Sequence, residues 1–148
     1  MKWNLIKQHL QGSASDLIEA HFHDLTRESW ADLFCWIKNK LQLLDNQHGR
    51  TNTNELDLDL FLGEKMSYIA HIRMDDGYEL SLSIIEPNKL IIDIEIGEVN
   101  TEEKFKMFLK NIIHIASILN CRHHIICPEI EPDKAFVVNG CLKSNSDK

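Results

Sequence analysis

Apolar and polar residues alternate along four short segments between Glu55 and Gly97. The pattern is clearest at 55–60, Glu-Leu-Asp-Leu-Asp-Leu, and at 90–96, Leu-Ile-Ile-Asp-Ile-Glu-Ile. A period of two places the aliphatic side chains on one face of a sheet and the acids on the other. The chain is therefore expected to form an antiparallel meander with one apolar and one acidic face. The predicted strands are 56–62, 68–74, 78–84 and 90–96.

Two segments outside the meander carry apolar residues at helical spacing. After a candidate N-cap at Thr26, the apolar positions from Trp30 to Leu44 recur every three or four residues, which predicts a helix of about five turns. A second long helix is predicted after Asn100, with Glu103 as its capping-box partner. Its apolar stripe consists of Phe105, Phe108, Leu109, Ile112, Ile115, Ala116 and Leu119.

The remaining segments give weaker signals. Residues 3–11 fit a short helix, and 17–25 fit another, although a strand over 20–25 stays open as an alternative. Residues 123–127 have the composition of a buried strand, and 135–138 fit a last strand or a short helix. The polar tail from Lys143 to Lys148 is expected to be frayed.

These elements predict one α+β domain spanning residues 1–148. Each long helix has one apolar stripe, and the meander has one apolar face. Burying these surfaces together gives an antiparallel sheet of four or more strands with two long amphipathic helices packed on one face. The acidic face would then remain open to water or to a partner.

Composition narrows the function class. Hydrophobic residues make up 43% of the chain and charged residues 26%, as in ordinary globular proteins. The net charge of −7 disfavours nucleic acid and anionic membranes as partners, because both attract basic surfaces. No secretory signal or membrane span is evident, and the four cysteines show no exported disulfide pattern. A cytoplasmic location is therefore expected.

The best metal-binding candidate is the cluster of Cys121, His123, His124 and Cys127. Thiolates and imidazoles are zinc ligands, but the Cys-x-x-Cys spacing of common zinc sites is absent. On a strand, His123 and His124 also point to opposite faces. His21 and His23 would share a face only on a strand, and would need His71 or Asp24 to complete a site. We expect no metal and no other cofactor.

The acids also raise the possibility of catalysis. Asp57 with Asp59, and Asp93 with Glu95, are carboxylate pairs of the type used in glycoside or Mg²⁺-dependent hydrolysis. Such sites lie in clefts, whereas here the flanking pattern is a regular strand. No Gly-x-Ser-x-Gly motif is present. We therefore expect no catalytic residues and interpret the acids as a solvated or partner-binding face.

The order of elements, from the meander through the long helix to Ala135-Phe-Val-Val-Asn-Gly140, loosely resembles acyl-CoA N-acetyltransferases. That family binds the CoA pyrophosphate with a glycine-rich loop at the N-terminus of the long helix. The corresponding stretch here, Gly97 to Lys104, lacks the second glycine and carries Glu98, Glu102 and Glu103. The resemblance therefore implies at most a related scaffold without catalysis.

In size, acidity and layout, the chain also resembles bacterial immunity proteins of contact-dependent growth inhibition and related polymorphic toxin systems. This resemblance implies a non-catalytic inhibitor that binds and blocks a cognate, basic toxin domain through its carboxylates. The predicted partner-binding residues are Asp57, Asp59, Asp75, Asp76, Glu79, Asp93 and Glu95.

Two other functions fit the same pattern. Small acidic chaperones of type III-like secretion systems also pair helices with a twisted sheet, and they act as dimers. A divergent enzyme, either an acetyltransferase or a metal hydrolase, is the third class. The sequence leaves the oligomeric state and the identity of the toxin open.

Overall fold

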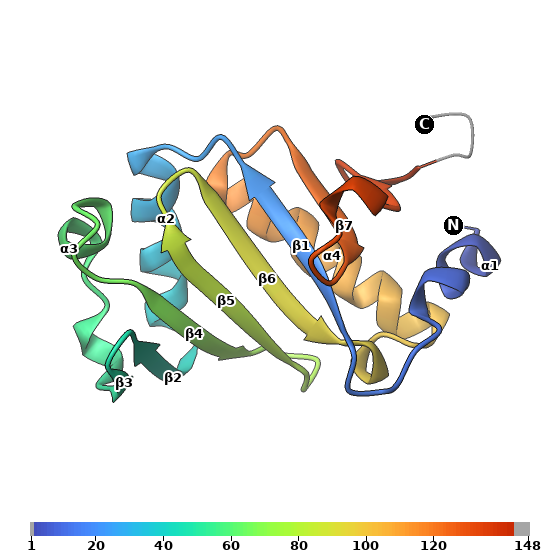
Figure 1. Cartoon of the computed structure of the whole chain (residues 1–148), viewed down its shortest axis with the longest axis horizontal. Helices are drawn as coiled ribbons and strands as arrows, with labels where there is room; N and C mark the ends of the chain where they lie inside the picture. Colours follow the sequence, from blue (N-terminus) through green and yellow to red (C-terminus); the bar gives the residue numbers. More distant parts are fainter. Residues whose placement is uncertain (1, 144–148) are drawn as a thin grey trace.

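The computed structural model describes residues 2–143, so the tail predicted to fray lies outside the described residues except for Lys143. The chain combines helices with strands, and three of the strands, those between residues 68 and 95, follow one another directly (Figure 1). The helices are α1 (Trp3–Lys7), α2 (Arg27–Lys38), α3 (Leu58–Leu62) and α4 (Glu102–Leu119), with short 3₁₀ turns η1 (Gln8–Leu10), η2 (Thr53–Glu55), η3 (Ile96–Glu98) and η4 (Pro132–Lys134). The strands are β1 (Leu17–His23), β2 (Leu41–Asn46), β3 (Gly49–Thr51), β4 (Tyr68–Arg73), β5 (Glu79–Glu86), β6 (Lys89–Glu95), β7 (His124–Pro128), β8 (Val137–Val138) and β9 (Cys141–Leu142).

The strands of the described residues form one sheet of nine strands in the order β3-β2-β4-β5-β6-β1-β7-β8-β9. Every neighbouring pair is antiparallel. The meander β4-β5-β6 lies at the centre, and β1 is inserted between β6 and β7. The predicted fold class, an α+β protein with an antiparallel sheet of four or more strands, is confirmed.

Helices α2 and α4 lie side by side behind the sheet and cover one of its faces (Figure 1). Both start at a threonine whose side chain accepts a backbone N–H, Thr26 from Ser29 and Thr101 from Lys104, which satisfies a donor that the helix itself cannot. Their apolar stripes pack on the inward residues of the meander, which are buried as predicted. Those residues are Tyr68, Ala70, Ile72, Met74, Tyr78, Leu80, Leu82, Ile84, Leu90, Ile92, Ile94 and Ile96.

The helix predicted over residues 17–25 is wrong. Strand β1 occupies Leu17–His23, which is closer to the alternative prediction of a strand over 20–25. Ile18, Ala20 and Phe22 are buried at the helix-covered face, so a period of two is present alongside the helical spacing. Pairing on both sides with β6 and β7 decides for the strand, because a central position in a sheet overrides weak local preference.

The helix predicted from Thr26 to Leu44 ends at Lys38, where Asn39 caps it. Leu41 and Leu44 continue the helical spacing, yet both belong to β2, which pairs with β4. Leu44 is fully buried, but its side chain enters the core from a strand of the sheet rather than from a helix. The spacing alone cannot distinguish these outcomes over so short a stretch, and the pairing with β4 decides between them.

The first predicted strand, 56–62, is also wrong. Asp57 accepts a hydrogen bond from the Leu60 N–H (2.9 Å) and caps α3. Phe61 interrupts the alternation, and its ring lies 4.5 Å from that of Trp30 between centroids. Burying this aromatic ring requires a helical turn that brings Leu56 and Phe61 to the core and leaves Leu60 exposed.

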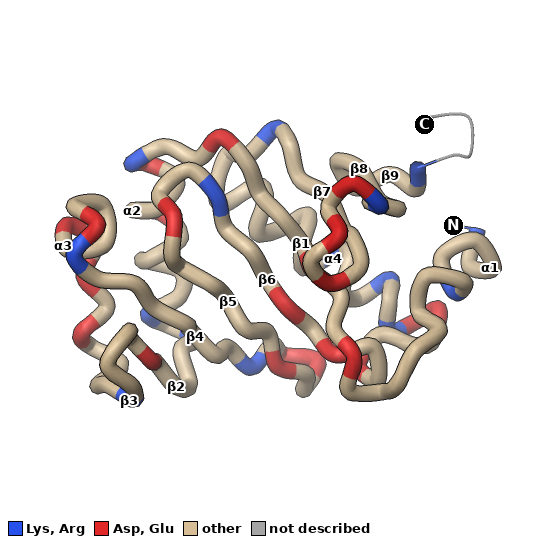
Figure 2. The backbone as a smooth tube through the Cα atoms, in the orientation of Figure 1, with Lys and Arg blue, Asp and Glu red and all other residues tan. Residues whose placement is uncertain are grey.

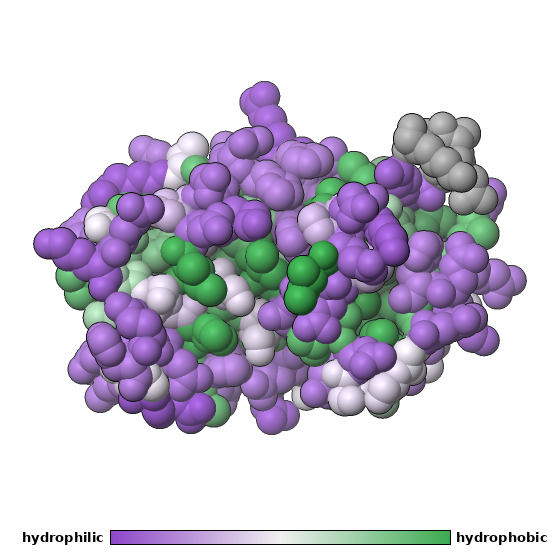
Figure 3. Space-filling view, viewed as in Figure 1, coloured by the Kyte–Doolittle hydropathy of each residue, from purple (hydrophilic) through white to green (hydrophobic). Residues whose placement is uncertain are grey.

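The opposite face of the sheet is not covered by any long helix and faces the viewer in Figure 1. The segment from Glu129 to Lys134, which includes η4, crosses this face over β1 and β7. The rest is open, and apolar groups gather at its centre among hydrophilic ones (Figure 3). The exposed apolar residues on this face include Leu43, Ile69 and Ile85. We call this surface the open face.

Candidate functional site

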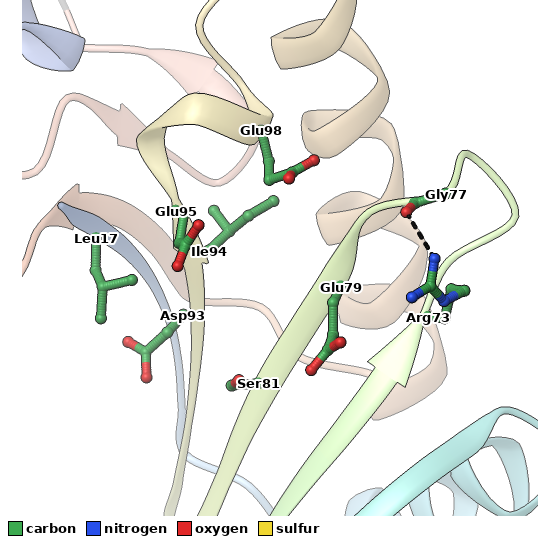
Figure 4. A pocket seen from close by; sticks show the side chains of 9 residues that line it. All are labelled: Leu17, Arg73, Gly77, Glu79, Ser81, Asp93, Ile94, Glu95 and Glu98. Atoms are coloured by element: carbon green, nitrogen blue, oxygen red, sulfur yellow. Dashed lines mark hydrogen bonds between the residues drawn. The ribbon is translucent and has the colours of Figure 1, made fainter. Parts of the chain in front are cut away.

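Carboxylates gather at one end of the open face, where β6 ends and β4 turns into β5 (Figure 2). There the surface forms a hollow of about 530 Å³. Figure 4 shows its acids arranged around the opening, from β5, β6 and η3. We call this the acidic hollow, and its lining residues are Leu17, Arg73, Gly77, Glu79, Ser81, Asp93, Ile94, Glu95 and Glu98.

Strand register brings these acids together. Ser81 on β5 pairs with Asp93 on β6, so Glu79 and Glu95, each two residues along its strand, project from the same face. The hairpin between β4 and β5 turns at Asp75-Asp76-Gly77, as predicted. Gly77 adopts a positive φ of +90°, a conformation that glycine accepts readily. Asp75 and Asp76 therefore lie at the hairpin tip beside the hollow.

The hollow has a strong excess of negative charge. Glu79, Asp93, Glu95 and Glu98 line it, against the single guanidinium of Arg73, which donates to the Gly77 carbonyl (3.3 Å). Crowded carboxylates in a concave surface raise the local negative potential and attract cations. A lysine or arginine side chain from another molecule would find several acceptors there.

Asp93 differs from the other acids of the hollow because it is half-buried, whereas they are exposed. Burial, a hydrogen bond with the Glu19 carboxyl and the charge of Glu19 raise the pKa of Asp93 to about 7. Glu19 is its cross-strand partner on β1. The pKa of Glu19 is lowered, because hydrogen bonds from His21, the Ile130 N–H and Asp93 outweigh its desolvation. A proton shared by this pair therefore favours Asp93 over Glu19.

His71 connects the hollow to the neighbouring strands. Its Nε2 lies 3.1 Å from Asp45, and its Nδ1 lies 3.3 Å from the Ser81 hydroxyl and 3.4 Å from Glu79. A serine, a histidine and an aspartate that contact one another in that order can form a catalytic triad. Here Ser81 lies in a strand paired on both sides, so the backbone N–H groups needed to bind an oxyanion are engaged in the sheet. The arrangement therefore serves to hold His71 between acids.

The structure brings together five of the seven predicted partner-binding residues. Glu79, Asp93 and Glu95 line the hollow, and Asp75 and Asp76 lie at the hairpin tip. Asp75 is 3.6 Å from the Lys40 ammonium, and Asp76 accepts a hydrogen bond from the Asn111 amide (3.2 Å).

Asp57 and Asp59 are not on the sheet, which corrects the prediction that they share its acidic face. Both belong to the α3 region, at the opposite end of the view from η3 and α1 (Figure 1). Asp57 caps α3, and Asp59 pairs with Arg27 at 2.9 Å on the surface. Asp57 and Asp59 alternate with leucines along the sequence, but this stretch forms a capped helical turn rather than a strand.

Sequence reasoning missed two members of the site. The resemblance to acetyltransferases places Glu98 in the stretch that corresponds to their CoA-binding loop, but η3 turns it towards the hollow. The helix predicted over 17–25 includes Glu19, whereas Glu19 lies on β1 with Asp93 as its neighbour. The alternation of Ile18, Ala20 and Phe22 was the signal that could have placed Glu19 on the open face.

The cysteines and histidines at 121–127 do not form one cluster. Cys121 Sγ lies near the carbonyls of His23 and His123, at 3.4 and 3.1 Å. His124 faces the helix side and stacks on Phe22. Cys127 faces the other side of the sheet, where it lies close to Glu19 and His21. The predicted separation of the two histidines on opposite faces thus holds.

Comparison with known proteins supplies a fold match. No family model and no curated protein matches the chain. One chain of the crystal structure of the toxic C-terminal tip of CdiA from Pseudomonas aeruginosa in complex with immune protein superposes with a TM-score of 0.60. The match has 16% identity and covers 88% of this chain and 98% of that chain. At this identity, the likeness shows a shared fold.

A second similar structure is a T6SS protein from Pseudomonas aeruginosa, with a TM-score of 0.38 and 13% identity. It covers 76% of this chain and 41% of that chain, and a likeness this weak carries no argument.

In the part of the chain that the structure describes, no helix has the length and apolarity needed to cross a membrane. The chain shares its fold with one chain of a solved complex of a toxin and its immune protein.

Proposed function

We propose that this protein is an immunity protein that binds a cognate toxin domain and blocks it without catalysis. The observation that carries the proposal is the fold match to one chain of the CdiA toxin tip and immune protein complex, along nearly the whole of that chain. The net charge of −7 and the acidic hollow favour the immune protein, rather than the toxin, as the chain of that complex to which this protein corresponds.

The proposed binding surface is the acidic hollow with the hairpin tip beside it. Its carboxylates are Asp75, Asp76, Glu79, Asp93, Glu95 and Glu98. A toxin with a basic substrate site would place lysine or arginine side chains among them. Complementary charge speeds encounter and penalises wrong partners, and close charge pairs in the contact add affinity.

The apolar centre of the open face supports the same surface. Ile69 and Ile85 are 39% and 56% exposed and lie on β4 and β5, whose other ends, at Arg73 and Glu79, line the hollow. Protein interfaces combine an apolar core with charged groups, and exposed aliphatic side chains on strands that end at carboxylates fit that pattern. A basic, partly apolar toxin surface would therefore match the open face.

The binding test uses the toxin domain encoded beside this gene and a charge reversal in the hollow. We expect Glu79→Lys with Glu95→Lys to weaken binding by about 100-fold or more and to slow association, because central charges dominate such contacts. The matched control is Asp59→Lys with Glu64→Lys at α3, which makes the same change in net charge away from the hollow. The measurements are calorimetry and association kinetics at several salt concentrations.

Two outcomes would contradict the proposed surface. One is full affinity in the Glu79→Lys, Glu95→Lys protein. The other is an equal loss in the α3 control, which would show a general effect of charge. Circular dichroism of each variant confirms that it is folded before binding is measured.

A growth test separates an immunity protein from a toxin. The chain expressed alone in bacteria should be harmless, and it should restore growth to cells that express the neighbouring toxin domain. Growth arrest by this chain alone would assign it to the toxic partner instead. Protection should fail in the Glu79→Lys, Glu95→Lys variant and persist in the α3 control.

A further inference from the structure

Beneath the Glu129–Lys134 segment, the open face holds a second cluster that toxin binding does not require. Glu19 and His21 on β1 and Cys127 on β7 each offer one metal-ligand atom, and these atoms all lie within 4.8 Å of one another. We call these three residues the buried donor cluster. Within residues 2–143, no other group of three such donors meets this distance.

The sheet register explains why these donors meet. On β1, Glu19 lies between Asp93 of β6 and Cys127 of β7, so the three form one row across neighbouring strands. His21 is two residues along β1 and projects from the same face. Strands in a sheet lie about 4.8 Å apart, which brings the side chains of Glu19, His21 and Cys127 together without any loop.

The cluster is closed off from water. Glu19 and His21 are 9% and 4% exposed, and Cys127 is fully buried. The segment above contributes the Ile130 N–H, which donates to Glu19 Oε1 at 3.0 Å. A carboxylate, an imidazole and a thiol are seldom buried together without a shared partner, because each loses its hydration.

Hydrogen bonds among the described residues satisfy this cluster only in part. His21 Nε2 lies 3.0 Å from Glu19 Oε1, but His21 Nδ1 has no hydrogen-bond partner, and neither has Asp93 Oδ1. An unpartnered imidazole nitrogen in a buried space leaves this cluster short of a partner, which a bound cation would supply.

We propose that the buried donor cluster is a zinc site, with Glu19, His21 and Cys127 as ligands. Thiolate, imidazole and carboxylate together match the ligands that zinc accepts. Ligand atoms around zinc lie roughly 3.5 Å apart, so the side chains need to close by about 1 Å. On binding, the thiol of Cys127 releases a proton to solvent, and His21 coordinates as the neutral imidazole.

Metal uptake is measured on the full, tag-free chain. We expect one zinc ion per chain to resist dialysis, with Zn²⁺ raising the melting temperature and Mg²⁺ leaving it unchanged. Co²⁺ in place of zinc should give a sulfur-to-cobalt charge-transfer band in the near ultraviolet. This band reports the thiolate directly in the unmodified protein, so the test stands even where a variant fails to fold.

Variants identify the ligands. Cys127→Ser should abolish the cobalt band. His21→Gln should weaken zinc binding by more than about 100-fold, which exceeds the loss expected for a residue that only hydrogen-bonds a ligand. The matched controls, Cys121→Ser and His23→Gln, should bind zinc as the unmodified chain does. These controls share residue types with the cluster but lie at the His23 end of β1, beyond the strand positions of Glu19 and His21.

Absence of stoichiometric zinc in the unmodified chain, or of a thiolate band with Co²⁺, would overturn the proposal. Retention of zinc by Cys127→Ser, or its loss in Cys121→Ser, would assign the metal to other residues and overturn it as well. Neither result bears on toxin binding, which is measured separately through Glu79 and Glu95.

Discussion

The two faces of the sheet are built from the same strands but differ in what they bury. At the covered face, Ile72, Leu82 and Ile92 are fully buried against α2 and α4. At the open face, the residues that alternate with them include His71, Ser81 and Asp93, which retain hydrogen-bonding and charged groups. Burial is therefore complete and apolar on one side, and partial and polar on the other.

This difference separates stability from recognition. Apolar burial at the covered face stabilises the fold at about 25 cal/mol per Å² of surface removed from water. The open face gathers like charges and buries polar groups under a short segment, which costs free energy unless a partner or a cation compensates. The four predictions below test this division, beginning with the largest expected effect.

A truncation at each face tests the comparison most directly. Leu82→Ala, in the middle of β5, should lower the free energy of unfolding by about 3 kcal/mol, because it leaves a cavity in the core. Ile85→Ala, on the same strand but 56% exposed at the open face, should change it by less than about 0.5 kcal/mol. Urea denaturation measures both. Equal losses would show that the open face is part of the folding core.

The proton on Asp93 should make the open face sensitive to pH. Its folded pKa of about 7 lies above the ordinary value of 3.8, so its contribution to stability is full at low pH and is lost as pH rises through 7. Asp93→Asn retains the neutral form. In metal-free protein it should be more stable than the unmodified chain by on the order of 2 kcal/mol near pH 8, with little difference near pH 4.

Glu19 acts with the opposite sign. Its pKa is lowered, so its contribution is present at high pH and is lost as pH falls through the folded pKa. The difference between Asp93→Asn and the unmodified chain isolates Asp93, provided that denaturation curves are recorded at matched ionic strength. A difference that stays constant between about pH 4 and pH 8 would contradict the buried, proton-sharing pair.

Asp57 resembles the open-face acids in sequence but has a backbone partner. Its carboxylate caps α3 by accepting the Leu60 N–H, so Asp57→Ala should destabilise the protein by about 1 kcal/mol. The same substitution should leave toxin affinity unchanged. Thermal denaturation and calorimetry together check this expectation, and Asp57→Asn, which can still accept the N–H, should recover most of the loss.

The smallest expected effect is a gain in stability. Glu95 has no hydrogen-bond or ion-pair partner among the described residues and shares the hollow with Glu79 and Glu98. Glu95→Gln should therefore stabilise the protein by about 0.3 kcal/mol at low salt, and the gain should disappear at high salt. A loss of stability would indicate that Glu95 has a structural role. The variant should also weaken binding to the toxin.

Sequence periodicity was sufficient where many residues agreed. The strands β4, β5 and β6 and the helix α4 lie close to their predicted bounds, because long apolar patterns with turn residues between them admit one arrangement. The same logic failed for short segments. Residues 55–60 and 90–96 share the alternation, yet only the second forms a strand, since Phe61 and the cap at Asp57 favour a helical turn.

The candidate site was predictable in part for the same reason. Glu79, Asp93 and Glu95 could be placed on one face from alternation alone, because two neighbouring strands joined by a tight turn have a defined register. The position of β1 between β6 and β7 could not be predicted in this way. It depends on contacts between residues more than 70 positions apart, such as Glu19 with Asp93, for which a single sequence holds no local signal.

The sequence by itself determined the fold class, the apolar core of the meander and the sign of the open face, because these follow from local period and composition. Only the tertiary structure decided which acids meet, which proton they share and which thiol lies beside them. Strand order brings Glu19, Asp93 and Cys127 into one row, and burial under a distant segment then changes their chemistry. Both effects arise from long-range packing, on which local patterns carry no information.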